Sequence, residues 1–197
     1  MSNRASKIKY NISQWDQHKL NYWAIPKCAN TAIKTALSNL QYKEKMLYSK
    51  VKWVHNPDNV MYIDRDAAKQ NKYYNFSVTR HPYERFISLY KDQGLRRPMF
   101  KNIKNISIDN FLENLEQYDL DKDPHTRLQT QYIFDNDTLL VDKVMDISKA
   151  KKYLQSFNLE LNYANKTQEM NIELSADQKN KIYNIYKDDF DKLGYTT

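Results

Sequence analysis

The sequence predicts an α/β fold with a small, mostly parallel central sheet, because two strand–loop–helix units follow one another along the chain. In the first unit, residues 21–25 (NYWAI) are expected to form a short buried strand and residues 31–40 (TAIKTALSNL) a helix. In the second, residues 74–79 (YNFSVT) are expected to form a strand and a helix to begin near Pro82, where a missing N–H costs nothing. Sheets of this kind bind ligands where strand C-termini meet helix N-termini.

Apolar periodicity predicts further elements after these two units. We expect a helix over residues 107–117, a strand over 138–147 and a helix over 148–157. The residues Ser175-Ala176-Asp177-Gln178 form a capping-box signature that opens a C-terminal helix, and Gly194 is expected to end it.

Composition indicates one globular domain. The chain has 197 residues, of which 41% are hydrophobic and 13% aromatic, and this richness in aromatic residues argues against disorder. Cys28 is the only cysteine, which excludes an intrachain disulfide and a cysteine-based zinc site. Neither a signal-peptide-like stretch nor an apolar run of membrane-spanning length is visible, so we expect a cytoplasmic protein without stable membrane anchoring.

The formal net charge of +7 favours anionic partners such as nucleotides, nucleic acids, anionic membranes or polyanionic glycans. The same charge is equally compatible with a solvated, lysine-rich surface. No block of five or more like charges is present, so no basic tail is expected.

The segment IPKCANTAIK (25–34) lies at the first predicted strand-to-helix turn. Helix N-termini present free N–H groups and a positive dipole end, so anions bind there. Lys27 adds a mobile positive charge, and Asn30 and the expected N-cap Thr31 add donors. Because the glycines of a Walker A loop are missing, the segment is either a different phosphate or sulfate site or an ordinary capped helix with an exposed lysine.

The segment FSVTRHPYERFISLYKD (76–92) has a second pattern of anion-binding residues. Arg80 ends a strand and can grip a phosphate bidentately through its planar guanidinium. Ser88 lies about two helical turns further on and can donate its hydroxyl, and Arg85 and Tyr90 are candidates to support that geometry. The alternative is a surface arginine, a helix serine and a local salt bridge of Arg85.

Together the two segments resemble the two signatures with which sulfotransferases bind 3'-phosphoadenosine-5'-phosphosulfate (PAPS). IPKCANTAIK is similar to the 5'-phosphosulfate loop, and residues 80–90 match the 3'-phosphate pattern R-x-P-x-x-R-x-x-S-x-Y. DPHTRLQTQYIFD (123–135) resembles the D-x-H-x-x-P-Q segment of the carbohydrate-sulfotransferase-like branch, family 2, with Leu128 where proline is usual. Asn165-Lys166-Thr167 and YKDDFDKLGY (186–195) resemble later elements of that branch.

This resemblance implies a three-layer, P-loop-NTPase-like sulfotransferase fold with a central sheet flanked by helices. It implies a single domain over residues 1–197, with an N-terminal extension over 1–20 and a core over 21–195. The chain would transfer a sulfuryl group from PAPS, with adenosine 3',5'-bisphosphate (PAP) as product, to a hydroxyl or amine of an acceptor, expected to be a carbohydrate or glycoconjugate. We expect an in-line displacement that requires no metal.

The resemblance also implies roles for individual residues. Lys27 would contact the 5'-phosphosulfate and stabilise the leaving phosphate, and Arg80 and Ser88 would bind the 3'-phosphate. The remaining residues expected to contact PAPS are Pro26, Cys28, Ala29, Asn30, Thr31, Ala32, Asn165 and Lys166.

A base must accept the proton of the acceptor hydroxyl, and histidine suits this role at neutral pH. His55, in VKWVHN, lies between the two phosphate segments, where related enzymes place a general base. His125 lies in the acceptor-side motif and is the second candidate, while a carboxylate base stays open. Arg127 and Gln129 are expected to orient the acceptor or to contact the sulfuryl group.

Two other classes of protein are compatible with parts of this pattern. A small ATP-dependent kinase is disfavoured by the missing Walker A glycines, and a nucleic-acid-binding module by the absence of a known motif. Cys28 is expected to fill space in the loop, since direct transfer needs no covalent intermediate. Arg96 and Arg97, in the basic stretch 94–106, would face PAPS or the acceptor, or form a solvated loop.

Overall fold

The computed structural model describes residues 11–42, 53–100, 106–155 and 170–197, and its contacts divide the chain into two compact units. The first unit comprises residues up to Thr79 together with Tyr132–Asn165, and the second comprises Arg80–Gln131 together with residues from Lys166 onward. The chain thus leaves the first unit at Thr79 and returns to it after Gln131. The domain expected over residues 1–197 contains two clusters of contacts.

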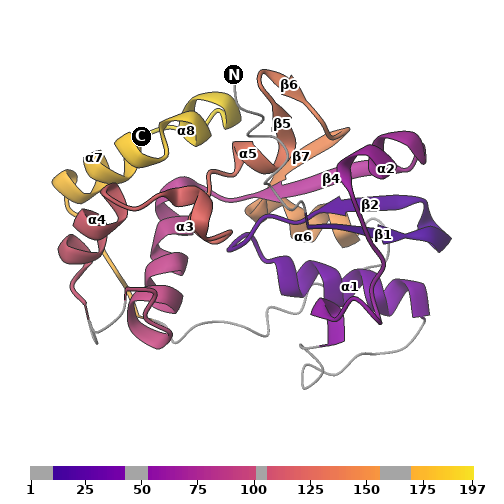
Figure 1. The fold of residues 1–197 in the computed structure, drawn as a ribbon, viewed down its shortest axis with the longest axis horizontal. Helices are drawn as coiled ribbons and strands as arrows, with labels where there is room; N and C mark the ends of the chain where they lie inside the picture. Colours follow the sequence, from indigo (N-terminus) through magenta and orange to yellow (C-terminus); the bar gives the residue numbers. More distant parts are fainter. Residues whose placement is uncertain (1–10, 43–52, 101–105, 156–169) are drawn as a thin grey trace. The chain divides into compact units, whose positions relative to one another are not determined.

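Five strands form the sheet of the first unit, in the order β3-β1-β2-β4-β7. Figure 1 labels β1, β2, β4 and β7 of this sheet. Strand β1 is antiparallel to β2 and β3, whereas β2, β4 and β7 are parallel. The predicted α/β class is confirmed, with a mixed sheet in which three adjacent strands are parallel. The strands are β1 (Ile12–Trp15), β2 (Leu20–Trp23), β3 (Tyr62–Ile63), β4 (Tyr74–Thr79) and β7 (Lys143–Asp146).

Strand β1 lies within the segment that the sequence pattern assigns to an N-terminal extension. Its four residues pair with β2 in register, with Ile12 opposite Trp23 and Trp15 opposite Leu20. Both Ile12 and Trp15 are buried to 1% exposure. Residues 12–15 are therefore part of the core, and the sheet begins before residue 21.

Helices cover both faces of this sheet, with α1 (Asn30–Tyr42) and α6 (Ile147–Gln155) on one side and α2 (Arg65–Gln70) on the other (Figure 1). On the α1 and α6 side, apolar residues form one cluster in which burial of each large side chain contributes about 1.5–3 kcal/mol. On the α2 side, Asn21 donates to the carbonyl of Ala68 at 3.4 Å. The apolar cluster includes Tyr22, Ile33, Leu37, Phe76, Val78 and Leu154.

The strand predicted over 138–147 is two strands in two different sheets. Strand β6 (Thr138–Leu139) pairs with β5 (Phe134–Asp135) in a two-stranded sheet, and only β7 joins the principal sheet. The run is interrupted by Leu140 and a bend at Val141 and Asp142, and the N–H of Asp142 donates to the carbonyl of Asn75 at 2.8 Å. Short helix α5 (Thr130–Ile133) precedes β5.

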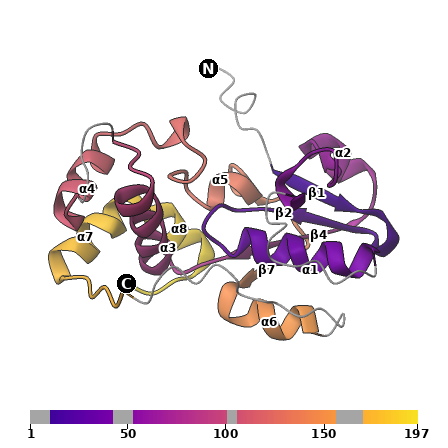
Figure 2. The same ribbon diagram turned by 90° about the horizontal axis from the view of Figure 1, so that it is seen from below.

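The second unit is helical, and Figure 2 shows α3, α4, α7 and α8 gathered together. Its apolar cluster includes Phe86, Leu89, Phe111, Leu115, Ile182 and Phe190. A short 3-10 helix of this unit lies at Leu120–Lys122, whereas those at Asp16–His18 and Trp53–His55 (η4) belong to the first unit. The helices are α3 (Pro82–Leu89), a π-helix η5 (Tyr90–Arg96), α4 (Ile108–Glu116), α7 (Ala176–Ile185) and α8 (Lys187–Leu193).

Three local helix signals in the sequence are confirmed. Pro82 occupies the first turn of α3, and the capping box of Ser175 and Gln178 is present. Gly194 ends α8 in the left-handed conformation, with φ of 69°. The single C-terminal helix that we expected is instead broken at Tyr186, whose φ is −114° and ψ 27° and whose side chain is buried in the apolar cluster.

Among the residues that the structure describes, no helix has the combination of length and apolar character needed to cross a membrane.

Gly94 lies in the π-helix at a point where a side chain cannot fit. A Cβ there would lie 2.7 Å from Cδ2 of Tyr90 and 3.3 Å from Cδ2 of Phe111. The Tyr90 ring cannot yield easily, because it packs against Phe111 and its hydroxyl donates to the carbonyl of Ile106 at 2.7 Å.

We therefore expect Gly94→Ala to destabilise the protein by about 1–3 kcal/mol through overpacking. Helix propensity alone would make Gly94→Ala stabilise the protein, by about 1 kcal/mol. Chemical denaturation of the full chain measures the difference, with Glu116→Ala on the exposed surface of α4 as a control. A midpoint for Gly94→Ala equal to or above that of the parent chain would contradict this packing.

Candidate functional site

The loop between β2 and α1 holds Lys27 in a strained backbone conformation. Lys27 has a φ of 69° and Ala29 a φ of 57°, both in the left-handed region. Each such non-glycine residue costs about 1–2 kcal/mol. Cys28, which lies between them, is fully buried, and its N–H donates to the carbonyl of Ile25 at 3.3 Å. Left-handed residues that alternate with residues of negative φ turn neighbouring N–H groups inward, which is the geometry of an anion-binding nest.

Helix α1 begins at Asn30, directly after this loop. Thr31 therefore lies inside the first turn and is not the N-cap that we expected, and the carbonyl of Ala29 accepts the helical bond from the N–H of Ile33 at 3.0 Å. The helix has 13 residues, so its amino end carries a full dipole beside the loop. Pro26, Lys27 and Ala32 are all partly exposed around this helix start.

His55 contacts the first turn of α1 through a side-chain hydrogen bond. Its Nε2 lies 2.9 Å from Oγ1 of Thr31, and the residue belongs to η4. Partial desolvation and the positive charge of Lys34 lower the pKa of His55 from its ordinary value, although much of the residue is exposed. The imidazole is therefore neutral at pH 7, which is the state that a general base requires.

Lys34 is a buried lysine one turn further along α1. Its Nζ donates to Oδ1 of Asn11 and to the hydroxyl of Tyr62, both at 2.8 Å, and the residue has 0% exposure. Burial lowers the pKa of Lys34 to about 7. The Tyr62 hydroxyl in turn donates to the carbonyl of Val54 at 3.2 Å. Lys34 is thus linked through Tyr62 to the turn that carries His55.

In the second unit, Arg80 directly follows the end of β4. Its Nε lies 3.2 Å from Oε2 of Glu84, and 28% of its side chain is exposed. The backbone of Arg80 is held by the side chain of Gln129, which accepts from its N–H at 2.9 Å and donates to its carbonyl at 2.8 Å. Ser88 lies partly buried in the last turn of α3.

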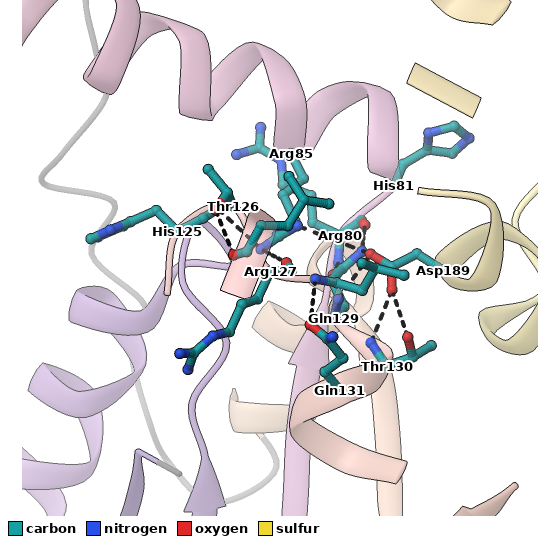
Figure 3. Close-up of polar contacts among 12 residues, drawn as sticks. Arg80, His81, Arg85, His125, Thr126, Arg127, Gln129, Thr130, Gln131 and Asp189 are labelled. Carbon is teal, nitrogen blue, oxygen red and sulfur yellow. Dashed lines mark hydrogen bonds and ion pairs between the residues drawn. The ribbon is translucent and has the colours of Figure 1, made fainter. Parts of the chain in front are cut away.

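A buried carboxylate organises the segment around Gln129 (Figure 3). Asp189 in α8 accepts from the N–H of Gln129, the N–H of Thr130 and the hydroxyl of Thr130, at 2.9, 2.9 and 3.1 Å. Nη1 of Arg85 lies 4.0 Å from the same carboxylate. Burial raises the pKa of Asp189, while Arg85 and these hydrogen bonds act in the opposite direction. Nη2 of Arg85 also donates to the carbonyl of Arg127 at 2.7 Å.

His125 forms a pair with Asp123 in the same segment. Nδ1 of His125 lies 2.8 Å from Oδ1 of Asp123, and the hydrogen bond with His125 lowers the pKa of Asp123. When Nδ1 carries the proton, Nε2 is the basic nitrogen, as in a histidine oriented by a carboxylate. The guanidinium of Arg127 donates to the carbonyl of Asp121 from Nε at 3.1 Å and from Nη2 at 2.6 Å.

Some residues that the sequence predicts to form the site are in direct contact in the structure. The structure joins Thr31 to His55 in the first unit and Arg80 to Gln129 in the second. Gln129, expected to touch the acceptor, is buried to 0% exposure and both polar atoms of its side chain bond the Arg80 backbone. Asn165 and Lys166 lie outside the described residues.

Sequence reasoning missed the parts that Lys34 and Asp189 play. Lys34 follows the apolar residue Ile33 and lies three residues before Leu37 on the buried side of α1, so its position on an apolar face was a usable signal. Asp189 lies within the segment YKDDFDKLGY that matched a family pattern, but its partners Gln129 and Thr130 are about 60 residues away in sequence. Among the residues described, no group of three or more His, Cys, Asp or Glu side chains is arranged to hold a metal ion.

Comparison with known proteins extends these observations. A curated relative, carbohydrate sulfotransferase 10 of Danio rerio, is 30% identical over 100 residues, and the match covers 44% of this chain. It spans 26% of the length of that relative, so the likeness concerns about a quarter of the longer protein. No solved structure matches the chain.

A family model provides the broader match. It describes the sulfotransferase family and matches residues 10–136, which include the Lys27 loop, His55, Arg80 and Gln129. Since this range is more than half of the 197 residues, the protein belongs to the sulfotransferase family.

Proposed function

We propose that this protein is a PAPS-dependent sulfotransferase that transfers a sulfuryl group to a hydroxyl or amine of a carbohydrate-containing acceptor. The observation that carries the proposal is the strained loop of Lys27 and Ala29 at the start of α1, within the range matched by the sulfotransferase family. Strain at a non-glycine loop is retained where the surrounding structure needs that geometry, and such sites are frequently functional.

In this proposal the Lys27 loop binds the 5'-phosphosulfate. The amides at the start of α1 and the side chains of Asn30 and Thr31 donate to the phosphate oxygens, and Lys27 supplies a positive charge where negative charge develops on the leaving phosphate. Cys28 acts as a buried space-filling residue, in keeping with its 0% exposure. Asn165 and Lys166 are proposed to contact the same nucleotide, from the family resemblance alone.

Arg80 and Ser88 bind the 3'-phosphate. A guanidinium binds a phosphate through two parallel hydrogen bonds, and 28% of the Arg80 side chain is exposed for this contact. A separate binding site for the 3'-phosphate favours PAPS over ATP, because the phosphates of ATP form one chain and none of them would occupy that site. Glu84 is the present partner of the Arg80 guanidinium and would give up this contact, since an exposed ion pair contributes only about 0–1 kcal/mol.

The reaction breaks one bond to sulfur and forms another. The acceptor oxygen forms the new bond to sulfur, the bond between sulfur and the 5'-phosphate oxygen breaks with its electron pair going to the phosphate, and PAP leaves. The acceptor proton passes to a histidine. By analogy with phosphoryl transfer, the residues mainly position the reactants and stabilise the spread charge.

His55 is the base that the contacts favour. It contacts Thr31 in the first turn of α1, directly after the Lys27 loop, and partial desolvation together with the charge of Lys34 lowers its pKa. His125 is the second candidate, because Asp123 orients its ring. Arg127 is proposed to bind the acceptor, although its guanidinium also supports the carbonyl of Asp121.

A carbohydrate acceptor is supported by the name of the Danio rerio relative and by the basic character of the chain. Arg96 and Arg97 contribute to that character, with 60% and 62% of their side chains exposed. Both are held by the buried carboxylate of Asp92, at 2.6 and 2.7 Å. The two guanidiniums are thereby ordered, which suits them to an acceptor with anionic groups.

Binding of PAP gives a first test. We expect PAP to raise the melting temperature of the protein more than equal concentrations of ATP or of a short oligonucleotide, because a ligand that binds only the folded state stabilises it by mass action. A thermal-shift series with the three ligands measures this. Stabilisation by ATP alone would indicate a kinase, and stabilisation by the oligonucleotide alone a nucleic-acid-binding module.

Substitution of the two cationic residues gives a second test. We expect Lys27→Ala and Arg80→Ala each to lower PAPS-dependent transfer by at least about 100-fold, since each removes a charge that contacts the donor. Transfer from labelled PAPS, measured over a panel of carbohydrate acceptors, provides the assay. Lys69→Ala on exposed α2 is the control, and parental turnover in Lys27→Ala or Arg80→Ala would refute the assignment.

The pH profile distinguishes the two histidines. Lys34 is charged below pH 7, and its charge lowers the pKa of His55, so activity should be lost only when the pH falls below the ordinary histidine range. Lys34→Met removes this charge and should raise the pKa of His55, which moves the acidic limb of kcat/KM to higher pH. If His125 is the base, the limb will stay in place.

Two further variants control for loss of structure in that experiment. His55→Ala should abolish transfer while PAP binding is retained, and His125→Ala should leave the position of the limb unchanged. Transfer that survives in His55→Ala and disappears in His125→Ala would reverse the assignment.

A further inference from the structure

The side chain of Gln129 substitutes for a neighbouring strand at the point where the sheet ends. The ladder between β4 and β7 stops at Thr79, which lies opposite Asp146. At the next residue, the amide of Gln129 accepts from the N–H of Arg80 at 2.9 Å and donates to its carbonyl at 2.8 Å. One side chain therefore satisfies both backbone groups of Arg80, as a paired strand would.

Gln129 is itself held from its own backbone. Its N–H donates to Oδ2 of Asp189 at 2.9 Å, and the neighbouring Thr130 donates to Oδ1 through both N–H and hydroxyl. Gln129 and Asp189 have 0% exposure and Thr130 has 5%. A glutamine fixed at both its backbone and its side-chain amide has little freedom to rotate.

Arg85 also holds this segment, at residues that precede Gln129. Nη2 of Arg85 donates to the carbonyl of Arg127 at 2.7 Å and to that of His125 at 3.3 Å, and its side chain has 3% exposure. Arg85 is too deeply buried for its charge to serve an external ligand, so its role is to hold backbone. Figure 3 shows Arg85 and Asp189 beside the segment that carries Gln129.

We propose that Gln129 is a positioning residue for the 3'-phosphate grip, meaning the contact of Arg80 with the 3'-phosphate. Gln129 fixes the backbone of Arg80, so that the Arg80 guanidinium binds the phosphate without reorganisation. The inference rests on the proposed function, in which Arg80 binds the 3'-phosphate. It assigns Gln129 a part in donor selection rather than in acceptor contact, since neither polar atom of the buried amide is left for an acceptor. Arg85 and Asp189 support this part by holding Gln129 in place.

The test compares PAP with adenosine 5'-monophosphate, because the two differ only in the 3'-phosphate. Isothermal titration gives the ratio of their affinities, and this ratio isolates the 3'-phosphate grip. Gln129→Met keeps the approximate volume but removes both hydrogen bonds to Arg80. We expect it to reduce the preference for PAP by about tenfold, through weaker PAP binding alone.

Gln131→Met is the matched control. Gln131 lies two residues away, and its amide accepts from the N–H of Leu128 at 3.1 Å and donates to Asp121 at 3.0 Å, with no hydrogen bond to Arg80. A general loosening of the segment would affect both variants and both nucleotides. The proposal requires that the preference for PAP fall in Gln129→Met and stay at the parental value in Gln131→Met.

Gln129→Glu adds a readout that a purely structural role would not move. An ionised carboxylate can accept from the N–H of Arg80 but repels its carbonyl, whereas a protonated carboxyl reproduces both hydrogen bonds of the amide. Burial raises the pKa of such a carboxyl. We expect the preference for PAP, taken relative to the parent protein at each pH, to recover as the pH is lowered.

The possible outcomes distinguish a failure of the proposed 3'-phosphate grip from a failure of the proposed role of Gln129. If the parent protein binds the two nucleotides equally, the proposed 3'-phosphate grip fails. If the parent prefers PAP and both Gln129 variants keep that preference, or lose affinity for both nucleotides alike, the grip stands and the role of Gln129 is refuted. If Gln129→Met fails to fold, Gln129→Glu decides the matter through its pH dependence.

Discussion

The carboxylate of Asp189 joins three parts of the second unit that are far apart in the sequence. It lies in the first turn of α8, accepts hydrogen bonds from Gln129 and Thr130, and lies near the guanidinium of Arg85 on α3. An ionised carboxylate without solvent is costly unless donors surround it, and removing one partner of such a set costs more than the contact is worth. These three segments therefore keep their arrangement together, and the position of Arg80 depends on all of them.

The two segments that we propose to bind anions achieve their geometry by different physical means. The Lys27 loop relies on backbone N–H groups and a helix dipole, so its precision comes from the left-handed residues that shape the turn. The Arg80 segment relies on one guanidinium, so its precision comes from the side chains that hold the backbone of that residue. Lys34 adds a third means, a buried lysine whose charge, together with desolvation, lowers the pKa of His55.

Several local signals in the sequence were informative, although the N-cap expected at Thr31 was not found. The strand over 74–79, proline at the start of α3, and the Ser175 capping box depend on neighbouring residues, and all are found in the structure. The apolar run over 138–147 misled because periodicity cannot tell one long buried strand from two short strands that join different sheets.

The parts of the site that escaped prediction depend on contacts between distant residues. Gln129 and Arg80 are 49 residues apart, and no local pattern indicates that a side-chain amide will pair with a backbone group. Lys34 was overlooked because a lysine is normally exposed, and only the partners Asn11 and Tyr62 make its burial tolerable. The residue types at the proposed anion sites could be read from the sequence, but the contacts that orient them could not.

The proposed donor loop reaches its left-handed conformation without a glycine at Lys27 or Ala29. A glycine there would relieve the strain, but it would also widen the range of conformations open to the chain before and after folding. A loop built from lysine and alanine loses its conformational freedom when the protein folds, and little remains to be lost when an anion arrives. The strain thus lowers the stability of the protein without ligand. In return, the loop loses little conformational entropy when it binds an anion.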